Sequence, residues 1–217
     1  ITLGRGGSDF TASIIASISN AKKLEIWTDV SGIFTSNPKL VKQAVPIDSL
    51  SYWEAMELSH FGAKVLYPPT IQPVMSKNIP VYIKNTFKKN DKGTLISSNS
   101  SNKSIIKGIT HIKNISLLTL EGSGMIGIPG FSKKLFEEIS NNNINIIMIT
   151  QASSEHSICI GINESDSVNS KKIVDEAFRY EIENSILSSS KIESKLSIIA
   201  LVGDNMRDHQ GISGKMF

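Results

Sequence analysis

The chain has 217 residues, of which 40% are hydrophobic and 20% are charged, and its net charge is +3. These values are typical of a globular protein of one or two domains that buries a sizeable core. The weak positive charge, without a dense Lys/Arg run, argues against a nucleic-acid partner, and no apolar run reaches the roughly 20 residues that cross a membrane. The single cysteine, Cys159, excludes an internal disulfide framework and indicates a reducing compartment, the cytoplasm.

The first 97 residues alternate between short apolar runs and longer amphipathic runs. We expect strands at 1–4, 23–30 and 79–86, and helices at 10–21, 49–66 and 70–78. Ser8 or Asp9 can cap the first helix, and Ser51 with Glu54 forms a capping box at the second. This alternation predicts an α/β unit, a largely parallel sheet with flanking helices.

A Ser/Asn-rich segment at residues 98–104 indicates a linker between domains. Beyond it we expect helices at 131–143 and 170–182, and strands at 104–112, 115–122, 144–153, 156–164 and 196–203. This order is the β-α-β-β-α-β pattern of an α+β unit. We therefore assign 1–97 to one domain, 105–190 to a first α+β unit and 191–217 to the truncated start of a second. Because both ends fall inside an element, we interpret the chain as a fragment.

Residues 115–136 align without a gap with residues 196–217, at an offset of 81. Gly122 matches Gly203, and Gly130 matches Gly211. In the first copy, glycines 122, 124 and 127 have the G-x-G-x-x-G spacing of a dinucleotide-binding loop. The second copy has Asn205 and Asp208 where that loop needs glycine, so we expect a strand, a glycine turn and a helix start instead.

The turn GRGGSD, residues 4–9, also joins a strand to a helix start. Its backbone N–H groups could accept an anion, Arg5 could hold a carboxylate by two hydrogen bonds, and Asp9 could hold an ammonium group. A capped surface turn without a ligand explains the same residues equally well. For the glycines of the later turn, a tight turn without a ligand is the favoured interpretation of any one of them.

Three motifs in this order resemble the second half of the kinase domain of aspartokinases, which belong to the amino-acid kinase family: GRGGSDFTAS, EIWTDVSGIFTSNP and EAMELSHFGAKVLYP. Residues 105–217 resemble the paired ACT regulatory domains that follow that domain. ITQASSEHSICIGI is similar to the threonine-sensitive branch of the family, whose members also carry an NADP-dependent homoserine dehydrogenase. The resemblance implies ATP-dependent phosphorylation of L-aspartate to 4-phospho-L-aspartate under feedback inhibition by L-threonine.

The resemblance also implies residue roles. Arg5, Ser8 and Asp9 would bind aspartate, with Arg5 and Asp9 at the site of phosphoryl transfer. ATP, together with Mg²⁺, would be bound by Thr28, Asp29, Phe34, Lys39, Lys64 and Val65. Threonine would contact Ile149 and Gln151. No metal ligands of the protein are expected, because the four histidines share no ligand spacing with Cys or acidic residues.

The chain departs from the family pattern in three of its motifs. Phe34 stands where the family has Tyr, so a hydroxyl is lost, and Tyr67 stands where the family has His. Asn37-Pro38-Lys39 stands for Asp-Pro-Arg, which replaces a bidentate guanidinium with a point charge. The changes at Phe34 and at residues 37–39 affect the expected ATP contacts of the loop that holds them.

We expect a homodimer or tetramer formed through the ACT domains, in which Arg5, Asp9, Asp29 and Lys64 surround one cleft at the carboxyl edge of the sheet. The family's phosphate-binding K-F-G-G-T-S segment and the dehydrogenase domain are not in these residues. We therefore expect the 217 residues alone to be inactive as a kinase. A lysine-sensitive aspartokinase, and an amino-acid-binding ACT module without catalysis, are the alternatives.

Overall fold

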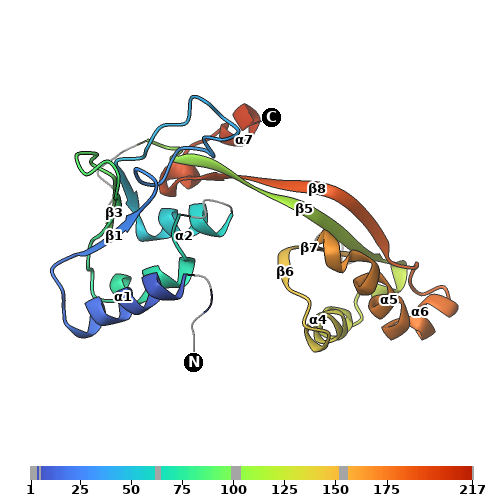
Figure 1. Ribbon diagram of the computed structural model, residues 1–217. Helices are drawn as coiled ribbons and strands as arrows, with labels where there is room; N and C mark the ends of the chain where they lie inside the picture. The colour runs from blue at the N-terminus through green and yellow to red at the C-terminus, as the bar shows by residue number, and fades with distance from the viewer. Residues whose placement is uncertain (1–3, 5, 62–64, 99–103, 152–155, 217) are drawn as a thin grey trace. The chain divides into compact units, whose positions relative to one another are not determined.

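The computed structural model describes residues 4, 6–61, 65–98, 104–151 and 156–216 (Figure 1). The chain forms two compact units, residues 1–111 with 199–217, and residues 112–198. Two long strands, β5 (Gly108–Glu121) and β8 (Lys191–Val202), have residues in both units. In the described part of the chain, no helix combines the length and the apolar character that a membrane crossing requires.

The first unit contains a four-stranded sheet in the order β1-β3-β4-β2. Its strands are β1 (Leu24–Thr28), β2 (Ser49–Ser51), β3 (Val81–Asn85) and β4 (Thr94–Ser97). β1 runs parallel to β3 and β2 runs parallel to β4, whereas β3 and β4 are antiparallel. The sheet is therefore largely parallel, as the sequence predicts. β4 was not expected, because it is short and lies in a polar stretch of the sequence.

Three helices accompany this sheet: α1 (Gly7–Ile18), α2 (Tyr52–His60) and α3 (Ile71–Met75). A 3₁₀ turn at Pro68–Thr70 leads into α3. The expected cap of α1 by Ser8 or Asp9 is wrong, because Gly6 is the N-cap with φ 81° and no side chain caps the helix. The left-handed backbone conformation at this position favours glycine. The helix therefore begins at Gly7, earlier than its apolar pattern predicts.

The core of the first unit is aliphatic and lies between the sheet and its helices. Its fully buried side chains come from every layer and include Ile33, Leu50, Ile71, Val74, Ile83 and Ile96. Val202, the last residue of β8, packs into the same cluster. The end of β8 is therefore part of the hydrophobic core of the unit that begins the chain.

The carboxylate of Glu54 connects three segments in this core. Its Oε2 accepts the backbone N–H of Ser51 at 2.9 Å, while the Ser51 hydroxyl accepts the N–H of Glu54 at 3.0 Å, which confirms the capping box. Its Oε1 accepts the N–H of Asp204 at 3.0 Å and lies 4.0 Å from the Nζ of Lys107. Both charged side chains are 1% exposed. One buried carboxylate thus joins α2 to the residues just before β5 and just after β8.

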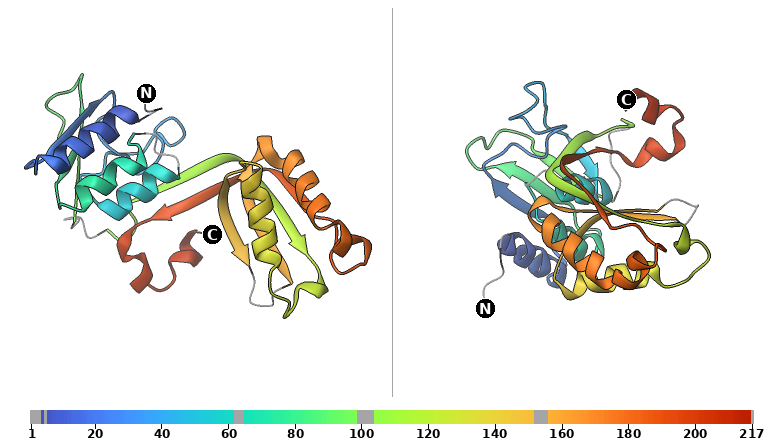
Figure 2. Two further views of the ribbon diagram at one scale, coloured as in Figure 1. Left: turned by 90° about the horizontal axis from the view of Figure 1, so that it is seen from below. Right: turned by 90° about the vertical axis from the view of Figure 1, so that its right-hand side faces the viewer.

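The second unit contains a sheet in the order β6-β7-β5-β8, with β6 at Ile146–Gln151 and β7 at Ser157–Asn163. β7 is antiparallel to both β5 and β6. The helices are α4 (Phe131–Asn141), α5 (Ser167–Ala177) and the short α6 (Arg179–Glu183). α4 and α5 lie on one face of the sheet (Figure 2). The predicted β-α-β-β-α-β order is confirmed.

The two strands expected at 104–112 and 115–122 form the single strand β5. Asn114, between them, has a positive φ of 59°. Asparagine tolerates this left-handed conformation better than most residues, so the strand bends there without ending. The polar break in the sequence therefore marks a local irregularity rather than a loop.

The two copies of the internal repeat make equivalent contacts in the structure. The equivalence also covers residues that precede each copy in the sequence. A Cβ atom at Gly122 would lie 2.4 Å from the carbonyl oxygen of Ile186, and one at Gly203 would lie 2.1 Å from that of Ile105. Ile105 and Ile186 are themselves one repeat apart. The following residues agree: the N–H of Ser188 donates to the Glu121 carbonyl at 2.9 Å, and the N–H of Lys107 donates to the Val202 carbonyl at 2.8 Å. Each glycine therefore packs against the residues that lead into the other copy.

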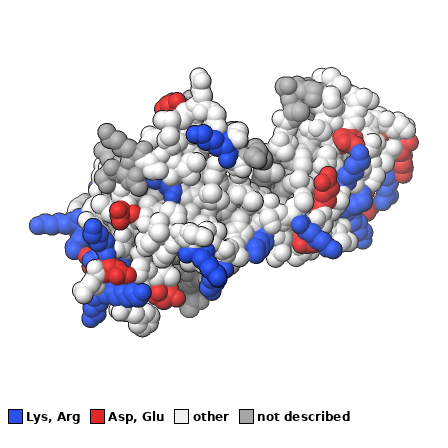
Figure 3. Space-filling model, turned by 90° about the horizontal axis from the view of Figure 1, so that it is seen from above, with Lys and Arg blue, Asp and Glu red and all other residues white. Residues whose placement is uncertain are grey.

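After Gly203, a 3₁₀ turn (Asp204–Asp208) and α7 (Ile212–Met216) follow in the same order as the 3₁₀ turn Ser123–Met125 and α4. On the face of the molecule that Figure 3 shows, Lys and Arg side chains are interspersed with Asp and Glu. The electrostatic surface there is therefore mixed rather than of one sign.

Asp175 connects α5 to the segment that leads into β8 through hydrogen bonds. Its carboxylate accepts hydrogen bonds from Lys171 at 2.9 Å, from the Ser189 hydroxyl at 2.8 Å, and from the N–H and hydroxyl of Ser190 at 2.8 and 2.7 Å. Burial alone would raise the pKa of Asp175, but the hydrogen bonds outweigh it and lower the pKa from 3.8 to about 2.

We expect Asp175→Asn to lower the free energy of unfolding by about 2 kcal/mol at pH 7, with a smaller loss in acid. Because the folded pKa is depressed, the charged carboxylate stabilises the fold above pH 4, and this contribution disappears as the pH falls toward 2. Urea unfolding of wild type and variant from pH 7 to pH 3 checks this. A difference between the two proteins that stays constant over that range would contradict it.

We expect Glu54→Gln to lower the free energy of unfolding by about 3 kcal/mol, because it removes the negative charge that lies 4.0 Å from the buried ammonium of Lys107. In the double variant Glu54→Gln, Lys107→Met, part of this loss returns, because no buried charge remains. A double-mutant cycle by urea unfolding measures both effects. Strictly additive losses would show that the two side chains do not interact.

Candidate functional site

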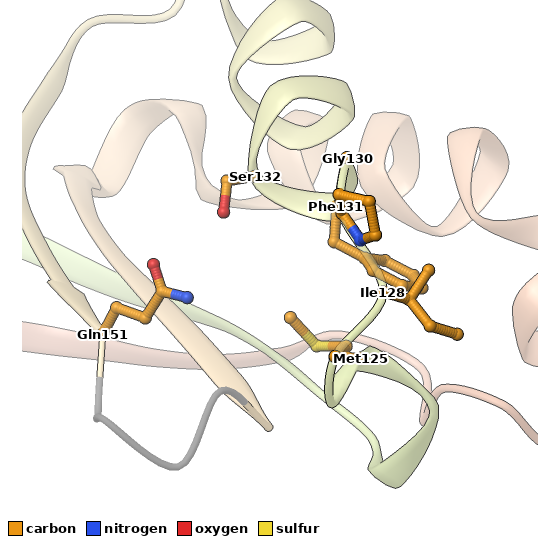
Figure 4. Close-up of a pocket in the computed structure, with 8 residues that line it drawn as sticks. Met125, Ile128, Gly130, Phe131, Ser132 and Gln151 are labelled. Carbon is orange, nitrogen blue, oxygen red and sulfur yellow. The ribbon is translucent and has the colours of Figure 1, made fainter.

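A pocket of about 340 Å³ lies in the second unit, where the turn after β5 meets the first turn of α4 (Figure 4). It is lined by Met125, Gly127, Ile128, Pro129, Gly130, Phe131, Ser132 and Gln151. Every lining residue except Gln151 belongs to the glycine-containing turn that the repeat singles out or to the first turn of α4 that follows it. The volume suits a ligand of amino-acid size.

The turn opens the first turn of α4 toward this pocket. Gly130 is the N-cap with φ 112°, and no side chain caps the helix. The first N–H groups of an α-helix, here those of residues 131–133, have no acceptor within the helix. Together with the positive end of the helix dipole, they attract a carboxylate. Gly127, with φ 70°, turns the chain back toward the helix.

Polar side chains face each other across the pocket. Figure 4 shows the amide of Gln151, at the end of β6, and the hydroxyl of Ser132, in the first turn of α4, pointing toward one another. The buried side chain of Met125 closes the apolar side. An amide both donates and accepts hydrogen bonds, so Gln151 can bind either charged group of an amino acid. Ile149 is 55% exposed on the same strand and is not among the residues that line the pocket.

The remaining glycines of the G-x-G-x-x-G spacing serve packing. A Cβ atom at Gly124 would lie 2.0 Å from the Cγ2 of Ile186, and the N–H of Gly124 donates to the Ile186 carbonyl at 3.2 Å. Gly122 approaches the same backbone, as described above. Two glycines of the three are therefore explained by the chain that covers them, and the third by its positive φ.

The site expected in the first unit begins at the start of α1. Ser8 and Asp9 lie in its first turn, and the Ser8 hydroxyl donates to Asp9 at 3.5 Å. Burial raises the pKa of Asp9, and the hydrogen bond from Ser8 partly offsets this effect. Arg5 lies outside the described residues.

Thr28 and Asp29 follow at the end of β1, where the Thr28 hydroxyl donates to Asp29 at 3.1 Å. The chain reverses direction between α1 and β1, so the first turn of α1 and the end of β1 lie at the same end of the unit (Figure 1). Asp9 and Asp29, two members of the expected cleft, therefore share one end of this unit. Lys64, like Arg5, lies outside the described residues.

Sequence reasoning missed a polar network beside Thr28. Asn85 ends β3 in parallel register with Thr28, is buried, and donates to the Ser31 hydroxyl at 2.9 Å. Ser31 in turn donates to Asp91 at 2.5 Å. An asparagine at the end of a strand parallel to β1 is the signal that could have identified it, because ligands of open α/β sheets bind at the carboxyl ends of strands.

The other expected ATP contacts are placed separately. Phe34 forms an isolated bridge with Pro46, and Lys39 is exposed, with its N–H donating to the side chain of Asn37 at 3.0 Å. Val65 is partly buried against the core. Among the described residues, no group of three or more His, Cys, Asp or Glu side chains could hold a metal ion.

The turn GRGGSD packs against the chain that follows Val65. A Cβ atom at Gly6 would lie 2.4 Å from the Cβ of Tyr67, and the ring of Phe10 meets that of Tyr67 edge to face at 6.5 Å. One turn further along α1, the Ser13 hydroxyl donates to the Thr70 carbonyl at 2.6 Å. The first and third sequence motifs are therefore in direct contact.

Comparison with known families assigns the N-terminal and the C-terminal parts of the chain to two different families. Residues 1–85 match the amino acid kinase family, and residues 118–178 match the ACT domain.

Among curated relatives, the bifunctional aspartokinase/homoserine dehydrogenase of Haemophilus influenzae is 40% identical over all of this chain, which covers 27% of that protein. Lysine-sensitive aspartokinase 3 of Escherichia coli is 33% identical, with 100% of this chain and 47% of that protein covered. The crystal structure of E. coli aspartokinase III in complex with aspartate and ADP matches the whole chain with a TM-score of 0.82 and 31% identity, over 48% of that structure. The chain thus spans between a quarter and a half of the relatives it matches.

We expect Gly124→Ala to lower the free energy of unfolding by about 3 kcal/mol, because the new methyl group overlaps the side chain of Ile186. Gly127→Ala is the matched control: nothing lies within 4 Å of the added Cβ, so only the strain of its positive φ, about 1 kcal/mol, remains. Chemical denaturation of both variants compares them. Equal losses would rule out close packing as the reason for Gly124.

Proposed function

We propose that this chain is part of an aspartate kinase controlled by an amino acid that binds beside Gln151. The reason is that the chain belongs to the aspartokinase family along its whole length. The enzyme transfers the γ-phosphoryl group of ATP to the side-chain carboxylate of L-aspartate. The match of the entire chain to a structure that contains aspartate and ADP is the observation that carries this proposal.

In this reaction the main task of the protein is to position the two substrates, rather than to form covalent bonds with them. A carboxylate oxygen of aspartate attacks the γ-phosphorus, the bond to the ADP oxygen breaks, and no proton has to be removed, because this carboxyl group is ionised at neutral pH. The main obstacle is the approach of two anions. Positive charge from Arg5, Lys64 and Lys39 would reduce it, and Mg²⁺ bound to the ATP phosphates supplies further positive charge.

The described residues fit the binding steps of this reaction. Asp9 faces the ammonium group of aspartate, and Ser8 beside it accepts or donates a hydrogen bond. Thr28 and Asp29 contact ATP from the end of β1, and the network of Asn85 and Ser31 supports the backbone that follows. The contact between GRGGSD and the segment after Val65 supports a shared cleft.

We propose L-threonine as the ligand of the pocket at Gln151. The N–H groups at the start of α4 take its carboxylate, and the Gln151 amide takes its ammonium group. None of the described lining residues is acidic, which favours a small uncharged side chain over the second ammonium group of lysine. Ile149 contributes apolar surface from the same strand.

Further features of the whole protein follow the same proposal. β6 is an edge strand with an exposed isoleucine, so pairing of ACT units between subunits would cover it and produce a homodimer or tetramer. We assign residues 1–97 to the kinase domain, 98–104 to the linker, 105–190 to the first ACT domain and 191–217 to the second. The protein acts in the cytoplasm, and an NADP-dependent homoserine dehydrogenase domain would lie outside these residues.

The similarity to a lysine-sensitive enzyme keeps that alternative as the second candidate for regulation. An ACT module without catalysis is the third, since residues 118–178 alone match the ACT domain. It leaves the match of residues 1–85 to kinases without an explanation.

The test is an ATP-consumption assay on the full-length protein, with and without aspartate, followed by titrations with threonine and lysine. We expect aspartate-dependent turnover that threonine suppresses and lysine does not. Suppression by lysine alone would assign the protein to the second candidate. Binding of threonine without any aspartate-dependent turnover would leave only the regulatory module.

A further inference from the structure

The first residues of β5 contact the two segments that are proposed to bind ATP. The Thr110 hydroxyl donates to the Phe61 carbonyl at 2.7 Å, and the Ile109 N–H donates to the Thr35 carbonyl at 2.8 Å. Thr35 follows Phe34, and Phe61 is the C-cap of α2, from which the chain continues to Val65. These two hydrogen bonds therefore connect one strand to both segments.

The contact with Thr35 is close enough to require glycine at the preceding position. A Cβ atom at Gly108 would lie 2.9 Å from the Thr35 carbonyl oxygen and 3.1 Å from the Cδ2 of Leu58. The Thr35 residue is itself held on its other side: its N–H donates to the Val45 carbonyl at 2.9 Å, and its hydroxyl accepts the Val45 N–H at 3.2 Å. The loop that contains Phe34 and Thr35 is thus held between β5 and the chain at Val45.

The strand is fixed at its start as well. Lys107 is buried beside Glu54 of α2, and its N–H donates to the Val202 carbonyl. α2 therefore meets the start of β5 near both of its ends, at Glu54 in its first turn and at Phe61 after its last.

We propose that residues 107–110, which we call the β5 lead, position the segments that form the nucleotide site. Thr110 is the positioning residue and acts through its hydroxyl. Its hydroxyl holds the Phe61 carbonyl, and the Ile109 N–H holds the Thr35 carbonyl, so that Phe34 and Val65 are kept in one arrangement. The nucleotide part of this inference rests on the proposed kinase function.

A purely structural role would make Thr110 one buried hydrogen bond among several. Tyr52 offers the matched comparison, because its buried hydroxyl donates to the Ile79 carbonyl at 2.8 Å and also ties α2 to another part of the unit. Ile79 has no proposed role in nucleotide binding. Loss of either hydroxyl removes one hydrogen bond to a carbonyl group, but only Thr110 bonds to a segment that leads to Val65.

The test compares Thr110→Val, Thr110→Ser and Tyr52→Phe in the full-length protein. For Thr110→Val we expect the KM for ATP to rise about fivefold, the factor that one net hydrogen bond is worth, while the KM for aspartate stays within about twofold. Thr110→Ser, which keeps the hydroxyl, restores the wild-type value. Tyr52→Phe leaves both KM values unchanged. Equal ATP KM values for Thr110→Val and Tyr52→Phe would overturn the proposal.

Hydrogen exchange separates this inference from the proposed function. In Thr110→Val we expect the amides of Phe34, Thr35 and Val65 to exchange about fivefold faster, and in Tyr52→Phe we expect them unchanged. If the wild type shows no aspartate-dependent turnover, the kinase proposal fails, and the exchange rates alone decide whether the β5 lead holds these segments. Unchanged exchange in Thr110→Val would refute it in either case.

Discussion

The buried carboxylate of Glu54 is the interaction on which the first unit depends. It caps α2 through Ser51, accepts the N–H of Asp204 and lies beside the ammonium group of Lys107. A buried ion pair costs desolvation, so its net effect on stability is small when both partners are present. Its effect here is geometric: a helix of the kinase-like part, the lead into β5 and the exit from β8 are held at one point.

The internal repeat explains why the exit of β8 belongs to this unit. Gly122 packs against Ile186, and Gly203 packs against Ile105, so each copy of the repeat is completed by residues that precede the other copy. This exchange places the second glycine turn in the unit that begins the chain. In the first copy, the same turn forms a pocket beside Gln151. The same turn therefore packs closely in both copies and, in the first copy, also lines a pocket.

The order of the elements was predictable because strand and helix periodicity is local, and the capping box of Ser51 and Glu54 is a local signal too. Gly6 as the cap of α1, and the single strand through Asn114, depend on backbone conformations that apolar periodicity does not reveal. Gln151 was singled out by the family motif around it, and its side chain lines the pocket, but its contact with threonine stays a prediction. Asn85, Thr110 and Lys107 were missed, because their roles come from contacts with residues distant in the sequence, and the assignments of Ser8, Asp9, Thr28 and Asp29 stay predictions.

We propose that this protein carries a nucleotide site and an amino-acid site whose affinities depend on each other. Such coupling is reciprocal, so each ligand must change the affinity for the other by the same factor. The direct measurement is calorimetric titration of the full-length protein with threonine, in the absence and in the presence of saturating ADP and aspartate. We expect threonine to bind more weakly when ADP and aspartate are bound. Identical threonine affinities in both titrations would contradict it.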